Sequence, residues 1–138
     1  MNADRVFADT NVLVYLYSTS SEDEVKRLLA YDALKQHKCL ISTQVLNEFS
    51  NFCIKKLKIS TERIQIYVSQ IRAGSDLSYI DENTISLALN VHKKYGYSYY
   101  DSLMIASALE HNCTYLLSED MADGQVIEGT LTIKNIFA

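Results

Sequence analysis

The chain alternates between short apolar runs and longer segments in which apolar residues recur at helical spacing. The runs within 6–8, 39–42 and 114–118 have little polar alternation, as is typical of parallel strands that helices cover on both faces. Between these runs, apolar side chains return at three- and four-residue steps, which is typical of amphipathic helices. The resulting order of strand, helix and strand predicts an α/β fold.

Helix signals delimit the segments between the runs. Residues 21–24 form a capping box, which predicts a helix that continues to about His37. We expect Val25, Leu28 and Leu29 to form the buried face of this helix. The same kinds of signal predict helices over 12–17, 43–58, 60–74 and 99–110, and one from a cap at 81 or 83 to Gly96.

The remaining segments complete a single sheet. A brief strand is expected at 77–80, a loop at 121–129 and a final, outer strand at 131–133. The chain has no proline, no internal repeat and no low-complexity linker. We therefore predict one domain over residues 1–138, long enough to bury a core without disulfides or zinc.

Composition and charge narrow the classes of function. The net charge of -4 argues against a protein that coats nucleic acid through bulk positive charge, although a nuclease with a metal-neutralised acidic pocket remains compatible. Three cysteines without any C-x-x-C spacing are typical of reduced core residues. We find no signal peptide and no membrane span, so we expect a cytoplasmic protein without a membrane partner.

The first apolar run ends in three polar residues, Asp9, Thr10 and Asn11. In open α/β sheets, ligands bind at such junctions between a strand and the following helix. Aspartate and threonine also cap helices well, so Asp9 and Thr10 alone fit capping equally well. The position nevertheless makes Asp9 the first candidate for a functional carboxylate.

Further acids occur where the predicted elements begin or end. Glu48 lies beside the apolar stripe of its helix, where it either turns inward or reaches out to water. Asp101 falls in the first turn of a nearly apolar helix, and Glu119 and Asp120 follow the strand at 114–118. Strand order predicts that Asp9 and Asp120 emerge at one edge of the sheet. Carboxylates that converge there repel one another unless a cation binds, and Mg²⁺ or Mn²⁺ suits oxygen ligands without His or Cys.

Four tyrosines between residues 95 and 100 precede Asp101. Aromatic side chains can stack on unpaired bases, but tyrosine beside a helix start more commonly packs with its hydroxyl hydrogen-bonded. The pattern is compatible with both roles.

Taken in order, these motifs resemble the PIN-domain ribonucleases and, among them, the VapC-type toxins of bacterial toxin-antitoxin pairs. The resemblance spans the chain, and it depends on the order and spacing of the motifs together. They lie at residues 9–13, 47–48, 99–108 and 116–121, and the serine-glutamate-aspartate sequence at 118–120 is familiar in the VapC-type branch.

The resemblance implies a three-layer α/β/α fold with a mainly parallel sheet of about five strands, and a Mg²⁺- or Mn²⁺-dependent endoribonuclease. It assigns metal binding and catalysis to Asp9, Glu48 and Asp101, with Asp120 as a more variable fourth acid and Glu119 as its alternative. Thr10, Asn11 and Ser118 would hold these acids in place. It further implies an RNA substrate, products with a 5′-phosphate and a 3′-hydroxyl, a VapB-like antitoxin and a homodimer.

Two other classes of function remain open. A receiver-like phosphotransfer domain also places acids and Mg²⁺ at strand ends, but it needs an acidic pair after the first strand, where this chain has Asp9 followed by Thr10. A catalytically silent PIN-fold interaction module is the third interpretation. Metal-dependent RNA cleavage would distinguish the first interpretation from both of these.

Overall fold

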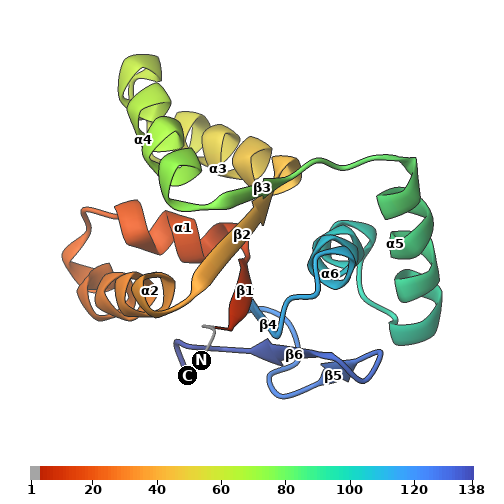
Figure 1. The fold of residues 1–138 in the computed structure, drawn as a ribbon. Helices are drawn as coiled ribbons and strands as arrows, with labels where there is room; N and C mark the ends of the chain where they lie inside the picture. Colours follow the sequence, from red (N-terminus) through yellow and green to blue (C-terminus); the bar gives the residue numbers. More distant parts are fainter. Residues whose placement is uncertain (1–3) are drawn as a thin grey trace.

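The computed structural model describes residues 4–138, which form a sheet of six strands between two layers of helices (Figure 1). The strand order is β3-β2-β1-β4-β6-β5, and every pairing is parallel except that of β5 with β6. The strands are β1 (Arg5–Ala8), β2 (Lys38–Ser42), β3 (Asp76–Ser78), β4 (Tyr115–Leu117), β5 (Val126–Ile127) and β6 (Leu131–Lys134).

Helices cover both faces of this sheet. In Figure 1, α1 and α2 lie on one side of the central strands and α6 lies on the other, with α5 packed on the outer side of α6. This arrangement confirms the predicted three-layer α/β/α fold. The helices are α1 (Thr10–Tyr17), α2 (Glu24–Gln36), α3 (Thr43–Lys55), α4 (Thr61–Gly74), α5 (Glu82–Tyr95) and α6 (Tyr99–Glu110), with a short 3-10 turn at Ser21–Asp23.

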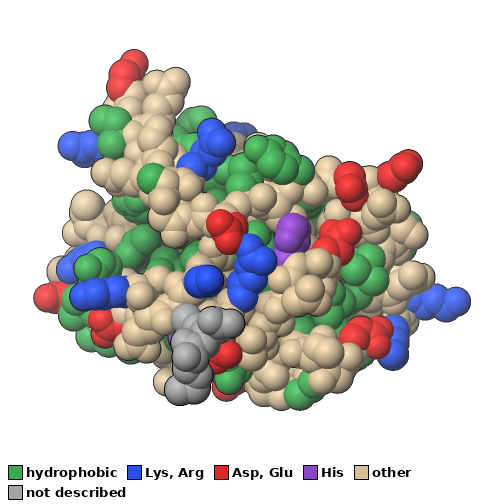
Figure 2. All heavy atoms as spheres, viewed as in Figure 1, with side chains coloured by type: hydrophobic (Ala, Val, Ile, Leu, Met, Phe, Trp, Pro, Cys, Tyr) green, Lys and Arg blue, Asp and Glu red, His purple; other side chains and the backbone are tan. Residues whose placement is uncertain are grey.

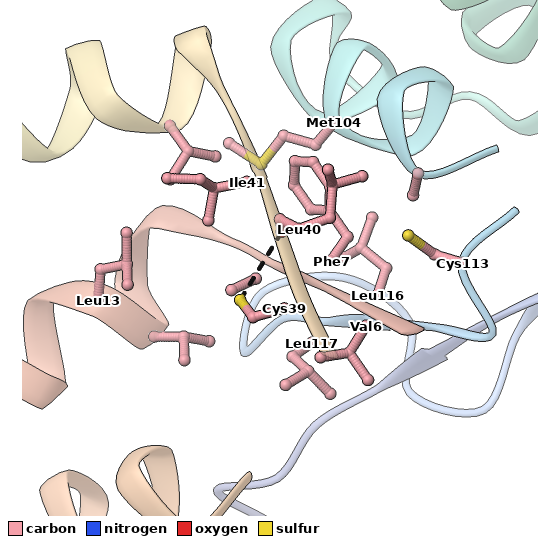
Figure 3. Close-up of a cluster of buried hydrophobic side chains, with 14 of the residues drawn as sticks. Val6, Phe7, Leu13, Cys39, Leu40, Ile41, Met104, Cys113, Leu116 and Leu117 are labelled. Carbon is pink, nitrogen blue, oxygen red and sulfur yellow. Dashed lines mark hydrogen bonds between the residues drawn. The ribbon is translucent and has the colours of Figure 1, made fainter. Parts of the chain in front are cut away.

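The core lies on both faces of the central strands. Val6, Phe7 and Ala8 are fully buried in β1, and Leu40 and Leu116 occupy the neighbouring strands beside Phe7. Figure 3 shows Phe7, Leu40 and Leu116 close together among the buried side chains of the central strands. The apolar runs are therefore interior strands, as predicted, because neither face of the sheet is left to water.

Helix α6 is the most deeply buried helix described here. All residues from 102 to 108 are buried, including two serines and two alanines. These small side chains let α6 lie close to both the sheet and α5. The helix therefore holds its first turn, which contains Asp101, in a fixed position at the sheet edge.

The predicted buried face of α2 is wrong. Val25, Leu28 and Leu29 are 68%, 56% and 38% exposed, whereas Ala30 is fully buried and Leu34 packs against the core. The capping box is wrong as well, because Ser20 caps the 3-10 turn that precedes α2. The 3-10 turn lies just before α2, and within α2 the small Ala30 is buried in the core in place of the larger apolar residues.

The end of the sheet also differs from the prediction. The expected loop at 121–129 contains the short strand β5, which pairs antiparallel with β6. β6 is therefore an interior strand and not the outer one. The predicted strand at 77–80 is found at Asp76–Ser78, and α3 ends at Lys55, three residues earlier than the predicted limit of 58. No helix in the described part of the chain is long and apolar enough to cross a membrane.

Candidate active site

Asp9 lies at the end of the central strand and caps α1. Its Oδ1 accepts a hydrogen bond from the Thr10 backbone N–H at 2.5 Å, and its Oδ2 accepts one from Ser118 Oγ at 3.0 Å. The side chain is only 6% exposed. Capping and delivery of a carboxylate to the sheet edge are thus two roles of one residue, and the capping bond fixes the orientation of the carboxylate.

Glu48 comes from the second turn of α3 and turns toward Asp9. Thr10 Oγ1 donates to its Oε1 at 2.8 Å, and Gln44 Nε2 donates to its Oε2 at 3.0 Å. The same Gln44 amide donates to the Tyr100 carbonyl at 3.0 Å. Glu48 therefore does not reach out to water, and Gln44 ties α3 to the first turn of α6.

Asp101 lies in that first turn, where Ser98 Oγ accepts a hydrogen bond from the Asp101 backbone N–H at 3.2 Å. Burial raises the pKa of the Asp101 carboxyl, and the negative charges of Asp120 and Glu48 raise it further. The sheet edge therefore brings a third carboxylate, from a different layer, into the electrostatic field of the others.

The same cause acts more strongly on Asp9. Burial raises the pKa of its carboxyl to about 6 against the opposing hydrogen bonds from Ser118 and Thr10, and the charges of Asp101 and Glu48 add to the increase. A buried acid beside two like charges is costly to ionise. This part of the molecule therefore favours a positive charge or a proton.

Glu119 and Asp120 follow β4 and point to different partners. Asn11 Nδ2 donates to Asp120 Oδ2 at 2.9 Å, so this carboxylate is held by the residue two positions after Asp9. Glu119 instead accepts from Tyr15 OH at 2.7 Å and from Lys26 Nζ at 2.6 Å. The ion pair with Lys26 lowers the pKa of Glu119. Of these two residues, only Asp120 is among the acids whose charges raise the pKa of Asp101.

Residues 6–122 match the family model for the PIN domain, which covers the whole arrangement from β1 to the loop after β4. The chain belongs to the PIN-domain family. The predicted family resemblance is thereby confirmed. The receiver-like alternative is wrong, because the PIN sheet continues beyond β4 with β6 and an antiparallel β5, and β1 is followed by a single acid.

Solved structures share this PIN fold. A toxin-antitoxin complex from Klebsiella pneumoniae is 19% identical, with a TM-score of 0.72 over 96% of this chain and 98% of that one. Mycobacterium tuberculosis VapC20, described as a Sarcin-Ricin loop cleaving toxin, is 12% identical, with a TM-score of 0.65 over 80% and 86% of the two chains. VapBC2 from Rickettsia felis, bound to a DNA fragment from its promoter, is 16% identical, with a TM-score of 0.66 over 95% and 99%. A search of curated proteins found no match.

The acids of this PIN domain suit a hard divalent cation in their chemistry. They supply only carboxylate oxygens, which Mg²⁺ and Mn²⁺ prefer, and the raised pKa values of Asp9 and Asp101 show the electrostatic cost that a cation would relieve. Within residues 4–138, no three Asp, Glu, His or Cys side chains are grouped closely enough to form a complete metal site. Three of the acids are held by hydrogen bonds from neighbouring side chains: Glu48 by Thr10, Asp120 by Asn11 and Asp9 by Ser118.

Three residues of this site were not predicted from the sequence. Gln44 precedes Glu48 by four residues on one helix, a spacing at which side chains meet, so the pair could have been found by that signal. Tyr15 and Lys26 contact Glu119 from 104 and 93 residues away, and no local pattern indicates such contacts.

Proposed function

We propose that this PIN domain is a metal-dependent endoribonuclease and the toxin component of a VapBC-type toxin-antitoxin pair. The observation that carries the proposal is the buried carboxylate of Asp9 at the end of β1, in the field of Glu48 and Asp101. Perturbed acids that converge at the carboxyl edge of a parallel sheet are a recognised mark of catalytic sites. Similar folds in a toxin-antitoxin complex and in an RNA-cleaving toxin support the choice of reaction.

In this proposal Asp9, Glu48, Asp101 and Asp120 hold Mg²⁺ or Mn²⁺. A divalent ion held by these acids would supply Lewis-acid chemistry, which would help to position a phosphodiester and to activate a water for its hydrolysis. Thr10 and Ser118 keep the two oxygens of Asp9 in fixed directions. Gln44 and the Thr10 hydroxyl do the same for the two oxygens of Glu48. The expected products carry a 5′-phosphate and a 3′-hydroxyl.

We assign the fourth acid to Asp120 in preference to Glu119. Glu119 forms an ion pair with Lys26 and also accepts a hydrogen bond from Tyr15, so its charge already has a positive partner. Asp120 has one contact, with the Asn11 amide, and is exposed at the site. It can therefore turn toward a cation without breaking an ion pair.

The proposed partners are unpaired RNA, a VapB-like antitoxin and a second copy of the chain. Unpaired segments suit a site at the sheet edge, because their bases can be splayed out and stacked. Lysines and arginines are scattered over the face seen in Figure 2 and do not gather into one positive patch there. The net charge of -4 also suits an inhibitor with a basic segment.

The test uses the purified chain, free of any partner, with a mixed pool of cellular RNA. Fragments with 5′-phosphates should appear with Mg²⁺ or Mn²⁺, disappear with excess chelator and be absent for Asp9→Asn. Mn²⁺ binding is measured in parallel by electron paramagnetic resonance. Tight Mn²⁺ binding without cleavage of any RNA would favour the catalytically silent PIN-fold module, and absence of both would remove the proposed site.

A further inference from the structure

A pocket of about 560 Å³ opens beside Glu48, between α3 and the first turn of α6. Its volume lies in the range of ~300–1,000 Å³ in which proteins hold small organic ligands. The wall includes apolar side chains from Ile80 and Leu103 and the ring of Tyr100. Amide side chains of α3 complete it, namely Gln44, Asn47 and Asn51.

The charges around this pocket are unlike those of a phosphate site. Among the described residues that line it, Glu48 is the one charged side chain, and none is Lys, Arg or His. A phosphate group would meet no positive partner in the pocket and a carboxylate at its rim. The pocket therefore suits a neutral, flat and polar-edged group.

Tyr100 presents the surface that such a group needs. This residue is 64% exposed although it lies in the first turn of a buried helix, and its ring forms a T-shaped pair with that of Tyr99, at 5.5 Å between centroids. Asn47 and Asn51 are exposed on α3 one helical turn apart, and each amide can both donate and accept hydrogen bonds. An aromatic face beside amides is a common means of binding an unpaired nucleobase.

The pocket is joined directly to the acidic site. Glu48 belongs to both, and Gln44 donates one hydrogen bond to Glu48 Oε2 and another to the carbonyl of Tyr100, each at 3.0 Å. Gln44 is itself 8% exposed, so this bridge is shielded from water. A phosphate bound at the acids therefore places a neighbouring nucleotide at the mouth of the pocket.

We propose that this pocket is a nucleobase subsite, which binds one unpaired base next to the scissile phosphate. Tyr100 stacks on the face of the base, and Asn47 and Asn51 hydrogen-bond its polar edge. The inference rests on the proposed ribonuclease function, which it deepens by assigning base selection to these three residues. A duplex cannot satisfy the subsite, because its bases are stacked and paired.

The first experiment tests the subsite without cleavage. Adenosine, guanosine, cytidine and uridine are titrated separately into the ¹⁵N-labelled chain with chelator present, and the side-chain amide signals of Asn47 and Asn51 are followed by nuclear magnetic resonance. At least one nucleoside should shift these signals in a saturable way. Tyr100→Ala should weaken its binding by about tenfold, and Tyr100→Phe should retain it. Tyr31→Ala, which removes a tyrosine that is 52% exposed outside the pocket, should bind as the parent does.

The second experiment measures cleavage of short RNAs in which one base at a time is replaced by an abasic residue. Loss of the base next to the cleaved bond should raise KM for the parent. For Tyr100→Ala, KM should be the same with the abasic substrate as with the complete one. Asn47→Ala keeps the stacking ring, so it should lose preference among the bases while the abasic substrate still raises its KM. Unchanged base preference in Tyr100→Ala and Asn47→Ala, or nucleoside shifts confined to other residues, would overturn the subsite. If the parent bound nucleosides as expected but cut no RNA, the proposed ribonuclease function would fail while base binding in the pocket stood.

Discussion

The two ends of the parallel sheet both contain buried groups with raised pKa values, yet they differ in what those groups can do. At the carboxyl end, burial raises the pKa of Asp9 to about 6. At the amino end, burial raises the pKa of Cys39, near the start of β2, to about 11 and that of Cys113, just before β4, to about 12. The same physical cause acts at both ends.

The difference lies in what surrounds each group. Asp9 has two fixed hydrogen-bond donors and two neighbouring acids, and Glu48 connects it to an open pocket. The two thiols are free and buried, with no acid or donor pair arranged around them as at Asp9, and a raised pKa keeps them protonated and unreactive. Burial alone therefore makes a group inert, and convergence of like charges at an accessible edge makes a candidate site.

The largest expected effect is the loss of activity in Asp101→Asn. The substitution removes a charge from the first turn of α6 without changing the size of the side chain, and Ser98 still caps the helix. We expect RNA cleavage to fall on the order of 10³-fold, beyond the 10–100-fold typical of residues that only support a metal ligand. Circular dichroism should show an unchanged fold. A variant that cut RNA as fast as the parent would remove Asp101 from the site.

Asp9→Asn should separate activity from stability. With chelator at pH 7, the variant should be more stable than the parent by roughly 1–3 kcal/mol, because it removes a buried charge beside two like charges. A raised pKa means that the folded parent loses stability as pH rises from about 4 to about 6, and the variant lacks this loss. Thermal unfolding at pH 4 and pH 7 measures both values. Equal stability of the two proteins at pH 7 would contradict the cost assigned to Asp9.

The two acids after β4 should differ in how much they contribute to RNA cleavage. Asp120→Asn should lower cleavage about 10–100-fold, whereas Glu119→Gln should change it only a few-fold, because Glu119 is held by Tyr15 and Lys26. Single-turnover rates at saturating Mn²⁺ compare them directly. The reverse order of effects would make Glu119 the fourth acid.

The smallest effect is expected at the amino end of the sheet. All three cysteines are buried, so a thiol reagent at pH 8 should not label the folded chain and should leave cleavage unchanged. Labelling should be complete once urea unfolds the protein. Rapid reaction of Cys39 or Cys113 in the folded state would show that the amino end opens.

Much of this architecture follows from local sequence. Residues 6–8 and 116–117 are apolar without alternation, and that pattern is sufficient to make β1 and β4 interior strands with Asp9 and Asp120 at their shared edge. The acids at this edge could be found because strand order alone brings them together. The proposed preference for Asp120 over Glu119 could not be predicted from the sequence, because it depends on Lys26, a contact across 93 residues.

The failures of prediction have a different origin. Val25, Leu28 and Leu29 form a genuine apolar stripe on α2, but periodicity shows only that the stripe exists, and the structure leaves it facing outward. β5 has two residues and carries no pattern of its own, and its pairing with β6 changes the place of β6 in the sheet. Tyr100 could be identified as an aromatic beside an acid, but its open pocket depends on α3 and on Ile80.

The short strands at the two borders of the sheet have a consequence for how the protein behaves at high concentration. β3 contributes three residues and β5 two, and Arg5 pairs with the exposed carboxylate of Asp76 at the β3 border. Borders this short, with a charged pair at one of them, give an incoming chain little backbone to pair with and so resist growth into aggregates. Copies of this chain can therefore crowd together without adding strands to one another.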